Sequence, residues 1–384
     1  GQYSNSAYYF YIKFLESIYP SLNNSGGDPK KIVDLLYEGL LEFHLKNYHP
    51  SNAKTFTYGK LPLEDSLSKI SKYYESFEKK VSSVDVKQPI FSTDKSEIFD
   101  VTIPGPVDTM NGKETSEQYC TSITWNLGNP LDPNMQYDIF KWKILSSLLF
   151  DGHNSPFYQE LIESGYGDDF SANTGLDSTT ALLSFTVGLN YLTKQKVDNF
   201  NEKVMEIINN KIIPELSNEE SSSYHGRIDA ILHQIEIGFK RHKPDFGFGL
   251  LSSIVPSWVN GVDPIDTLQV EKILSHFKED YKQNGLRIFK ELLEKTLCNP
   301  HSQKFKFTME PREDFTKQLV KDENLMIEKR VSELTEDNKK AIYEQNLELA
   351  KLQSEDQNTE VLPTLTIDDI PKRGDFYAID LGQV

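Results

Sequence analysis

Residues 119–148 read YCTSITWNLGNPLDPNMQYDIFKWKILSSL, and this stretch decides the fold. Residues 119–127 are rich in β-branched and aromatic side chains, which predicts a strand with Trp125 buried near its end. A break containing Gly, Asn and Pro follows. The apolar residues then recur at helical spacing: Tyr137, Phe140, Ile144, Leu145 and Leu148. A strand followed at once by an amphipathic helix indicates a fold in which helices pack on a sheet.

The segment after this helix predicts a second group of strands. The sequence DGHNSP at 151–156 breaks the helix, and residues 157–162 predict a further helical turn. Residues 170–192 alternate in polarity and are rich in Thr, Ser, Val and Phe, which predicts a β-hairpin that turns near 175–178.

The remainder of this region is mainly helical. Thr193 is an N-cap for a helix with Val197, Phe200, Val204, Ile207 and Ile208 on its inner face. Further helices are predicted at 219–242 and 266–297, and a strand at 304–309 places Phe305 and Phe307 on one face. Strands followed by groups of helices favour an α+β fold, with an antiparallel sheet and helices packed on one face. We predict that residues 118–310 fold without their neighbours.

Residues 312–362 contain no Gly or Pro and are rich in Glu, Lys, Gln and Leu. Thr335, followed by Glu336 and Asp337, indicates a second helix start, because acidic residues favour the positive end of a helix. Two antiparallel helices joined near 332–336 would form a hairpin that acts as a connector. Its interspersed charges are typical of a solvated surface.

The N-terminal region, roughly 1–85, predicts helix, loop, helix, strand and helix in that order. Ala7, Tyr11, Phe14, Leu15 and Ile18 recur at helical spacing, so we expect the chain to open close to or inside a helix. Asp28 and Pro29 of the SGGDP turn are suited to start the next helix. Residues 53–58 predict a short strand, and 65–77 a helix. Residues 85–118 suggest a connection or irregular strands.

Composition restricts the class of protein. The 384 residues carry a net charge of −17, which argues against nucleic acid as a partner and could attract cationic peptides. No apolar run approaches the roughly 18 residues that a membrane helix needs, so we expect no membrane partner. Cys120 and Cys298 are far apart with no CxxC motif, which argues against a disulfide scaffold or a cysteine zinc site.

The histidines do not have metal-site spacing. The sequence contains neither HExxH nor HxxEH. His44 and His49 would lie about 140° apart on a helix, and His225 and His233 about 80° apart without an obvious third ligand. Surface or capping roles are the ordinary explanation for these side chains. We therefore name no metal-binding residue.

Three further motifs favour structural roles over chemistry. His153 could act as a base beside Asp151 or Ser155, but no GxSxG motif is present and a helix C-cap at Gly152 is the better interpretation. The SGGDP loop lacks the GK[ST] ending of a phosphate loop. The strands at 179–191 could pair with an extended peptide at a sheet edge, although core strands are commoner. We name no catalytic residue, and the substrate-binding residues remain unknown.

Several longer stretches carry a family resemblance. They are YPSLNNSGGDPKKI at 19–32, FHLKNYHPSNAKTFTYG at 43–59, DGHNSPFYQELIESGYG at 151–167, DFGFGLLSSIVPSW at 245–258 and LPTLTIDDIPKRGD at 362–375. In order and spacing the chain resembles the pitrilysin-type (inverzincin) zinc metallopeptidases, specifically the fungal mitochondrial branch that degrades presequences. The resemblance covers essentially the whole chain.

The resemblance implies a set of expectations about organisation. Residues 1–100 would be the C-terminal part of a first peptidase-like domain and a connection, 101–311 a second α+β domain, and 312–384 the helical hairpin linker and the start of a strand region. The HxxEH segment would lie upstream of Gly1, as would a glutamate ligand just before it. In the family, two His and a Glu hold zinc and the motif's Glu acts as general base.

The resemblance also implies the partners and two functional alternatives. The expected partners are short, often basic, unstructured peptides and the missing C-terminal half of the same chain. The favoured expectation is a piece of an ATP-independent mitochondrial peptidase that binds no zinc and is inactive alone. The alternative is a noncatalytic structural or peptide-binding relative of the same fold. The sequence preceding Gly1 distinguishes the two.

Overall fold

The computed structural model describes residues 2–22, 24–80, 89–90, 98–180, 182–241 and 243–374. The chain divides into two compact units, Gly1–Val320 and Lys321–Val384. Among the described residues, no helix has both the length and the apolar character to cross a membrane. Part of the predicted connection at 85–118 and the end of the tail, 375–384, lie outside the described residues.

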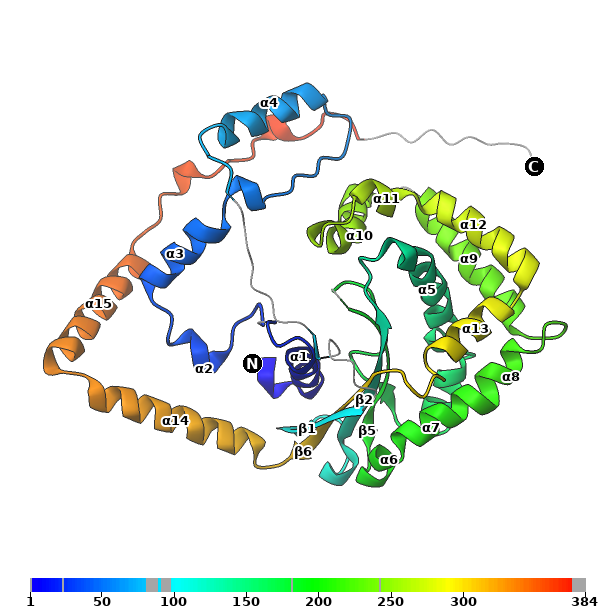
Figure 1. The fold of residues 1–384 in the computed structure, drawn as a ribbon. Coiled ribbons are helices and arrows are strands. Elements are labelled where there is room, and N and C mark those ends of the chain that lie inside the picture. The colour runs from blue at the N-terminus through cyan, green and yellow to red at the C-terminus, as the bar shows by residue number, and fades with distance from the viewer. Residues whose placement is uncertain are drawn as a thin grey trace. The chain divides into compact units, whose positions relative to one another are not determined.

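A six-stranded sheet organises the first unit (Figure 1). Its strands run in the order β1-β6-β2-β5-β3, and β4 also pairs with β5. The bounds are Ile98–Pro106 for β1, Tyr119–Gly128 for β2, Asp169–Phe170 for β3, Gly175–Asp177 for β4, Leu183–Leu192 for β5 and Lys304–Arg312 for β6. Every pair is antiparallel except β1 with β6, which is parallel. The predicted α+β class is confirmed, with one parallel pair added at the edge.

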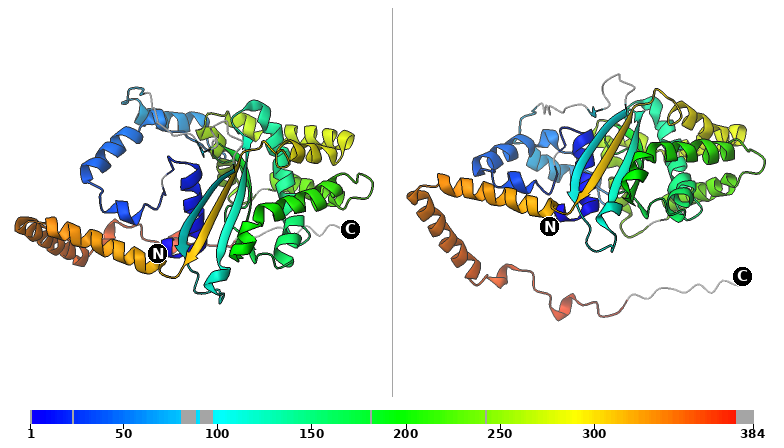
Figure 2. Two further views of the ribbon diagram at one scale, coloured as in Figure 1. Left: turned by 60° about the horizontal axis from the view of Figure 1, so that its bottom comes forward. Right: turned by 90° about the horizontal axis from the view of Figure 1, so that it is seen from below.

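The larger helical layer covers one face of this sheet (Figures 1 and 2). It contains α5 (Gln136–Phe150), α6 (Lys194–Asp198), α7 (Phe200–Ile207), α8 (Ile213–Leu216), α9 (Tyr224–Lys240), α12 (Val270–Asn284) and α13 (Arg287–Lys295), with π-helical turns at Tyr158–Glu163 and Ile208–Ile212. Alternate residues of β2 and β5, such as Trp125 and Phe185, point into this core because successive strand side chains face opposite ways. Thr193 caps α6 as predicted, and its side chain accepts a hydrogen bond from the N–H of Lys196.

A single helix, α1 (Ser6–Ile18), packs on the opposite face. Its buried stripe is Phe10, Phe14 and Ile18, which lies against Phe305, Phe307 and Met309 of β6. The predicted stripe was therefore partly wrong, since Ala7 and Tyr11 are exposed. The spacing of four between Phe10, Phe14 and Ile18 is the one that keeps three side chains on one line of a helix.

The segment between α1 and the sheet contains α2 (Pro29–Ile32), α3 (Tyr37–Asn47) and α4 (Leu63–Tyr74). Asp28 caps α2 through the N–H of Lys30, and Pro29 occupies the first turn, as predicted. The predicted strand at 53–58 was wrong: these residues form no ladder with any described strand. A strand needs a neighbour for its backbone groups, and these residues instead contact helix α10 (Phe246–Val259) through side chains.

The sequence also misplaced one turn and missed two helices. The hairpin turns at 178–182 rather than 175–178, because Asp177 accepts a hydrogen bond from the N–H of Thr179 and so starts the turn after β4. Helix α10 and the short α11 (Pro264–Leu268) were not predicted. The sequence of α10 is apolar on every side, and periodicity cannot identify such a helix.

Two long helices follow the sheet: α14 (Phe315–Glu333) and α15 (Glu336–Ser354). The predicted start at Thr335 is confirmed, since Thr335 and Asn338 form a reciprocal capping box. The two helices meet at an angle and do not lie side by side as an antiparallel hairpin (Figure 1). Neither helix buries a residue, so no apolar seam holds them together. Short 3-10 turns at Thr359–Val361 and Ile367–Asp369 follow, where a strand region was expected.

Candidate functional site

Metal-binding chemistry finds no support in the described part of the chain. No group of three or more His, Cys, Asp or Glu side chains that could hold a metal ion occurs among those residues. The residues present therefore do not fit the zinc site that the family resemblance implies, and no catalytic step can be routed through them. Both cysteines are free thiols. Burial raises the pKa of the Cys120 thiol well above its usual value, so this group stays protonated.

The N-terminal histidines have structural contacts. His44 stacks on Tyr48 with ring centroids 4.7 Å apart. His49 caps the short 3-10 helix Pro50–Asn52, where its Nδ1 accepts a hydrogen bond from the N–H of Ser51 at 3.2 Å. The His49 ring also meets the edge of Phe77. These contacts agree with the ordinary capping role predicted for this pair.

His153 does not form a catalytic pair with Asp151 or Ser155 among its described contacts. Its ring lies against Tyr158, and Nδ1 is 3.9 Å from a Glu163 carboxylate oxygen. Gly152 has φ +79, the left-handed geometry of a residue that ends a helix. The helix-end interpretation of DGHNSP is therefore confirmed.

The strands at 179–191 are internal. β5 pairs with β2 on one side and with β3 and β4 on the other, so its backbone is not available to an added peptide strand. The core interpretation of these strands is confirmed, and the alternative of a peptide-pairing edge at this strand is wrong. Neither this segment nor the SGGDP loop supplies a chemical site.

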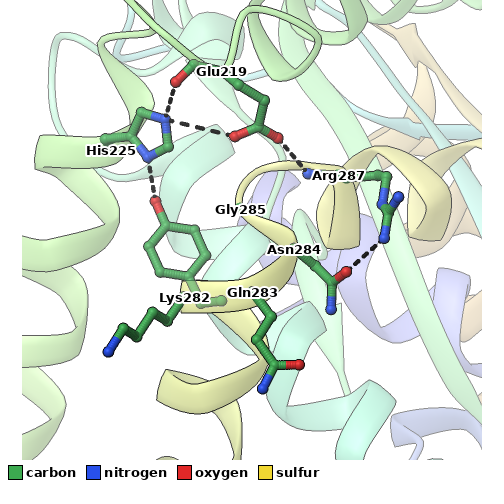
Figure 3. Close-up of a pocket in the computed structure, with 8 residues that line it drawn as sticks. Glu219, His225, Lys282, Gln283, Asn284, Gly285 and Arg287 are labelled. Atoms are coloured by element: carbon green, nitrogen blue, oxygen red, sulfur yellow. Dashed lines mark hydrogen bonds and ion pairs between the residues drawn. The ribbon is translucent and has the colours of Figure 1, made fainter.

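A polar pocket of about 540 Å³ lies where the start of α9, the end of α12 and the start of α13 meet (Figure 3). His225 Nδ1 lies 2.6 Å from the Tyr281 hydroxyl, and His225 Nε2 lies 2.9 Å from the Glu219 carbonyl oxygen. The Glu219 carboxylate accepts hydrogen bonds from the N–H groups of Leu286 (3.2 Å) and Arg287 (3.0 Å). Arg287 in turn donates to the side chain of Asn284.

One proton arrangement satisfies the contacts of His225. Burial raises the pKa of the Tyr281 hydroxyl, with Asp229 and Glu219 adding to the shift, so the phenol stays protonated. Tyr281 can then donate to Nδ1, while the Nε2–H of a neutral imidazole donates to the Glu219 carbonyl. Both ring nitrogens have partners in this arrangement. The pocket therefore joins three helices, and nothing in it is set up to act as a nucleophile or base.

A second pocket of about 710 Å³ lies beside α3 and α4. Aromatic rings dominate its lining, with a few amide and backbone groups; the lining residues include Phe43, Tyr48, His49, Tyr73, Tyr74 and Phe77. Such a surface can hold apolar side chains but has no chemistry of its own. The sequence predicted neither pocket, because both are built from residues that are far apart along the chain or at helix ends.

The fold and the absence of a metal cluster among the described residues agree with the comparisons with known proteins. The family description "Peptidase M16 inactive domain" matches residues 34–222, and a second family, described as associated with the C subgroup of M16 peptidases, matches residues 309–383. The chain belongs to the M16 family of peptidases. A solved structure of a peptidase M16 inactive domain from Pseudomonas fluorescens has a similar fold, with a TM-score of 0.55 at 16% identity. The likeness covers 81% of this chain and 67% of that one.

Three curated relatives share one name. The chain is 99% identical over its full length to "Presequence protease, mitochondrial" of Candida albicans. It is 54% identical to the protein of that name from Debaryomyces hansenii over the full chain, and 42% identical to that from Saccharomyces cerevisiae over 99% of the chain. The chain spans 36–37% of the length of these relatives.

Proposed function

We propose that this chain is part of an ATP-independent mitochondrial zinc metallopeptidase of the M16 family, which degrades presequence peptides and other short unstructured peptides. The observation that carries the proposal is 99% identity over the full chain to a protein named as a mitochondrial presequence protease. The proposed compartment is the mitochondrial matrix or intermembrane space. The described residues hold no metal cluster, so the zinc ligands would lie in another part of the longer polypeptide.

The domain organisation is proposed on the same basis. Residues 1–100 would complete a first peptidase-like domain, 101–311 would form a second one, and 312–384 would begin the linker to a C-terminal half. The sheet and its larger helical layer fall within the second range, and both long charged helices fall within the third. The partners would be basic, unstructured peptides and the remainder of the polypeptide.

A second candidate function has an observation in its favour. The description of the family that matches residues 34–222 contains the words "inactive domain". The chain could accordingly belong to a noncatalytic relative that binds peptides or serves as a structural subunit. The two candidates share the fold and differ in whether the longer polypeptide carries zinc.

One experiment separates these candidates. The chain and the longer polypeptide from the same source are purified, and each is measured for bound zinc and for cleavage of a fluorogenic, arginine-rich peptide. We expect the longer polypeptide to bind about one zinc per molecule and to cleave the peptide, and the chain alone to do neither. A longer polypeptide without zinc and without cleavage would favour the noncatalytic candidate. Stoichiometric zinc on the chain alone would contradict the proposal.

A further inference from the structure

Helix α10 presents an apolar surface that the rest of the unit covers incompletely. No charged residue occurs between Asp245 and Asp263, and α10 fills most of that interval. Of its residues only Ile254 is buried, while Phe248 and Val259 are 71% and 61% exposed. Exposed apolar surface of this kind usually marks a place where another chain binds.

Residues 53–58 show what this surface accepts. They run along α10 in an extended conformation, and the Lys54 ammonium lies 5.2 Å from the centroid of the Trp258 ring. The Tyr58 ring lies 5.8 Å from that of Phe246. A cation on the face of an indole and an aromatic pair are both specific attractive contacts.

Gly247 makes the second of these contacts possible. A Cβ at this position would come within 2.4 Å of the Tyr58 side chain. The missing side chain therefore leaves room for an aromatic ring beside Phe246. No such approach occurs at Gly249, where an added Cβ would meet no atom within 4 Å.

The spacing of the two anchor points suits an extended peptide. Trp258 and Phe246 are twelve positions apart on α10, a distance of about 18 Å along the helix axis. Four residues of extended chain span about 13 Å, and the long side chain of Lys54 covers the remainder. A cationic residue followed four positions later by an aromatic residue can therefore reach both points.

We propose that the surface formed by Phe246, Gly247 and Trp258 is a binding site for extended basic peptides, and that residues 53–58 occupy it as an internal ligand. Trp258 receives a Lys or Arg side chain, and the space beside Gly247 receives an aromatic or large aliphatic one. This inference rests on the proposed function for the class of peptide, since presequences are rich in Arg and poor in acidic residues.

Two features allow an external peptide to replace the internal one. Tyr58 remains 51% exposed while it contacts Phe246, and Lys54 is also exposed, so the internal segment is held by few contacts. The chain carries a net charge of −17, and Asp245 and Asp263 flank α10, which favours the approach of a cationic peptide. The internal ligand and the external peptide would compete.

The test is a binding measurement on the full chain. A fluorescently labelled peptide with Arg and Phe residues spaced as in Lys54 and Tyr58, and with no acidic residue, is titrated with protein while its anisotropy is followed. We expect Trp258→Leu to weaken binding roughly three- to tenfold, because the apolar contact stays and the cation–π contact is lost. We expect Lys54→Ser combined with Tyr58→Ser to strengthen binding, because the competitor is weakened. Thr57→Ser is the matched control.

The two glycines supply an independent check. Gly247→Ala displaces Tyr58 and should strengthen peptide binding, whereas Gly249→Ala, which makes the same change in helix propensity, should leave binding unchanged. Circular dichroism confirms that each variant is folded. Unchanged affinity in Trp258→Leu, or no gain on weakening the internal segment, would overturn the proposal. Absence of peptide binding together with concentration-dependent self-association would do so as well.

Failure of this inference is distinguishable from failure of the proposed function. The binding measurement uses the chain alone and needs no zinc or cleavage. The proposed function is tested by zinc content and peptide cleavage in the longer polypeptide. A longer polypeptide that cleaves basic peptides while the α10 variants leave binding unchanged would preserve the function and refute the site.

Discussion

The Glu219 carboxylate accepts hydrogen bonds from the N–H groups of Leu286 and Arg287, at the start of α13. The first N–H groups of a helix have no intrahelical acceptor, so a carboxylate here supplies partners and also meets the positive end of the helix dipole. Gly285 is close to this carboxylate and has φ +57. At the scale of single residues, a loop side chain thus substitutes for the missing local cap of α13.

We expect Glu219→Ala to lower the free energy of unfolding by about 1 kcal/mol, the usual contribution of a helix cap. Glu219→Gln, which keeps an acceptor but loses the charge, should fall between this variant and the wild type. Glu220→Ala, next to it in the same loop, is the matched control. Urea denaturation of the four proteins measures the effect, and equal midpoints for the two alanine variants would show that the cap contributes nothing.

A pH effect should arise from Glu215. Burial acts to raise the pKa of this carboxyl, but hydrogen bonds from the N–H of Ser223 and the hydroxyls of Ser222 and Ser223 outweigh it, so the pKa lies below its usual value of 4.5. A lowered folded-state pKa stabilises the protein above the unfolded-state pKa, and this contribution is lost as the pH falls through the folded-state value. Glu215→Gln should therefore reduce the loss of stability on acidification below pH 4.5, as followed by urea denaturation at a series of pH values. An unchanged pH dependence would contradict this account.

At the scale of elements, β6 depends on two partners that lie outside residues 118–310. It pairs in parallel with β1 along its whole length, and its side chains Phe305, Phe307 and Met309 pack against α1. The prediction that 118–310 folds independently is therefore too narrow in its boundaries. Removing β1 would leave a hydrophobic inner strand as an edge, which is a known cause of aggregation.

We expect residues 98–312 to be more stable and less prone to aggregate than residues 118–310. Guanidinium denaturation and light scattering of the two segments measure this difference. Both would still expose the Phe305 and Phe307 side chains that α1 covers, so a dye that binds apolar surface should bind both more than the whole chain. Equal stability of the two segments would mean that β1 adds little to the sheet.

Local signals in the sequence identified most of these elements. The strand at 119–127, the N-cap at Thr193 and the helix start at Thr335 each have a signal within a few residues, and all three are confirmed. Residues 53–58 have strand-like composition, but a strand exists only where a neighbour offers a ladder. Helix α10 has no polar face, so no periodicity marked it.

The surfaces were harder to predict than the elements. The pocket around Glu219 joins residues more than sixty positions apart, and the contact of Tyr58 with Phe246 joins two segments with no shared pattern. Such contacts follow from tertiary packing, which one sequence does not reveal. The uncharged interval between Asp245 and Asp263 was the one available signal for the α10 surface.

At the scale of the whole molecule, the two units differ in how much they bury. The first unit contains both hydrophobic cores, whereas α14 and α15 bury no residue. Leu325, Leu347 and Leu352 are exposed on these helices. Isolated helices of this length are only marginally stable in water, and most helical stability in proteins comes from tertiary packing.

We therefore expect backbone amides in α15 to exchange with deuterium much faster than those of β2 and β5, because local opening of α15 exposes no core whereas opening of the central strands requires unfolding of the sheet. Thr335→Ala should speed exchange further at the start of α15, since it removes the capping box. Ser332→Ala, just before the cap, is the matched control. If the longer polypeptide covers these helices, their exchange should slow there while that of β2 and β5 stays the same. Strong protection of α15 in the monomeric chain would refute the connector role.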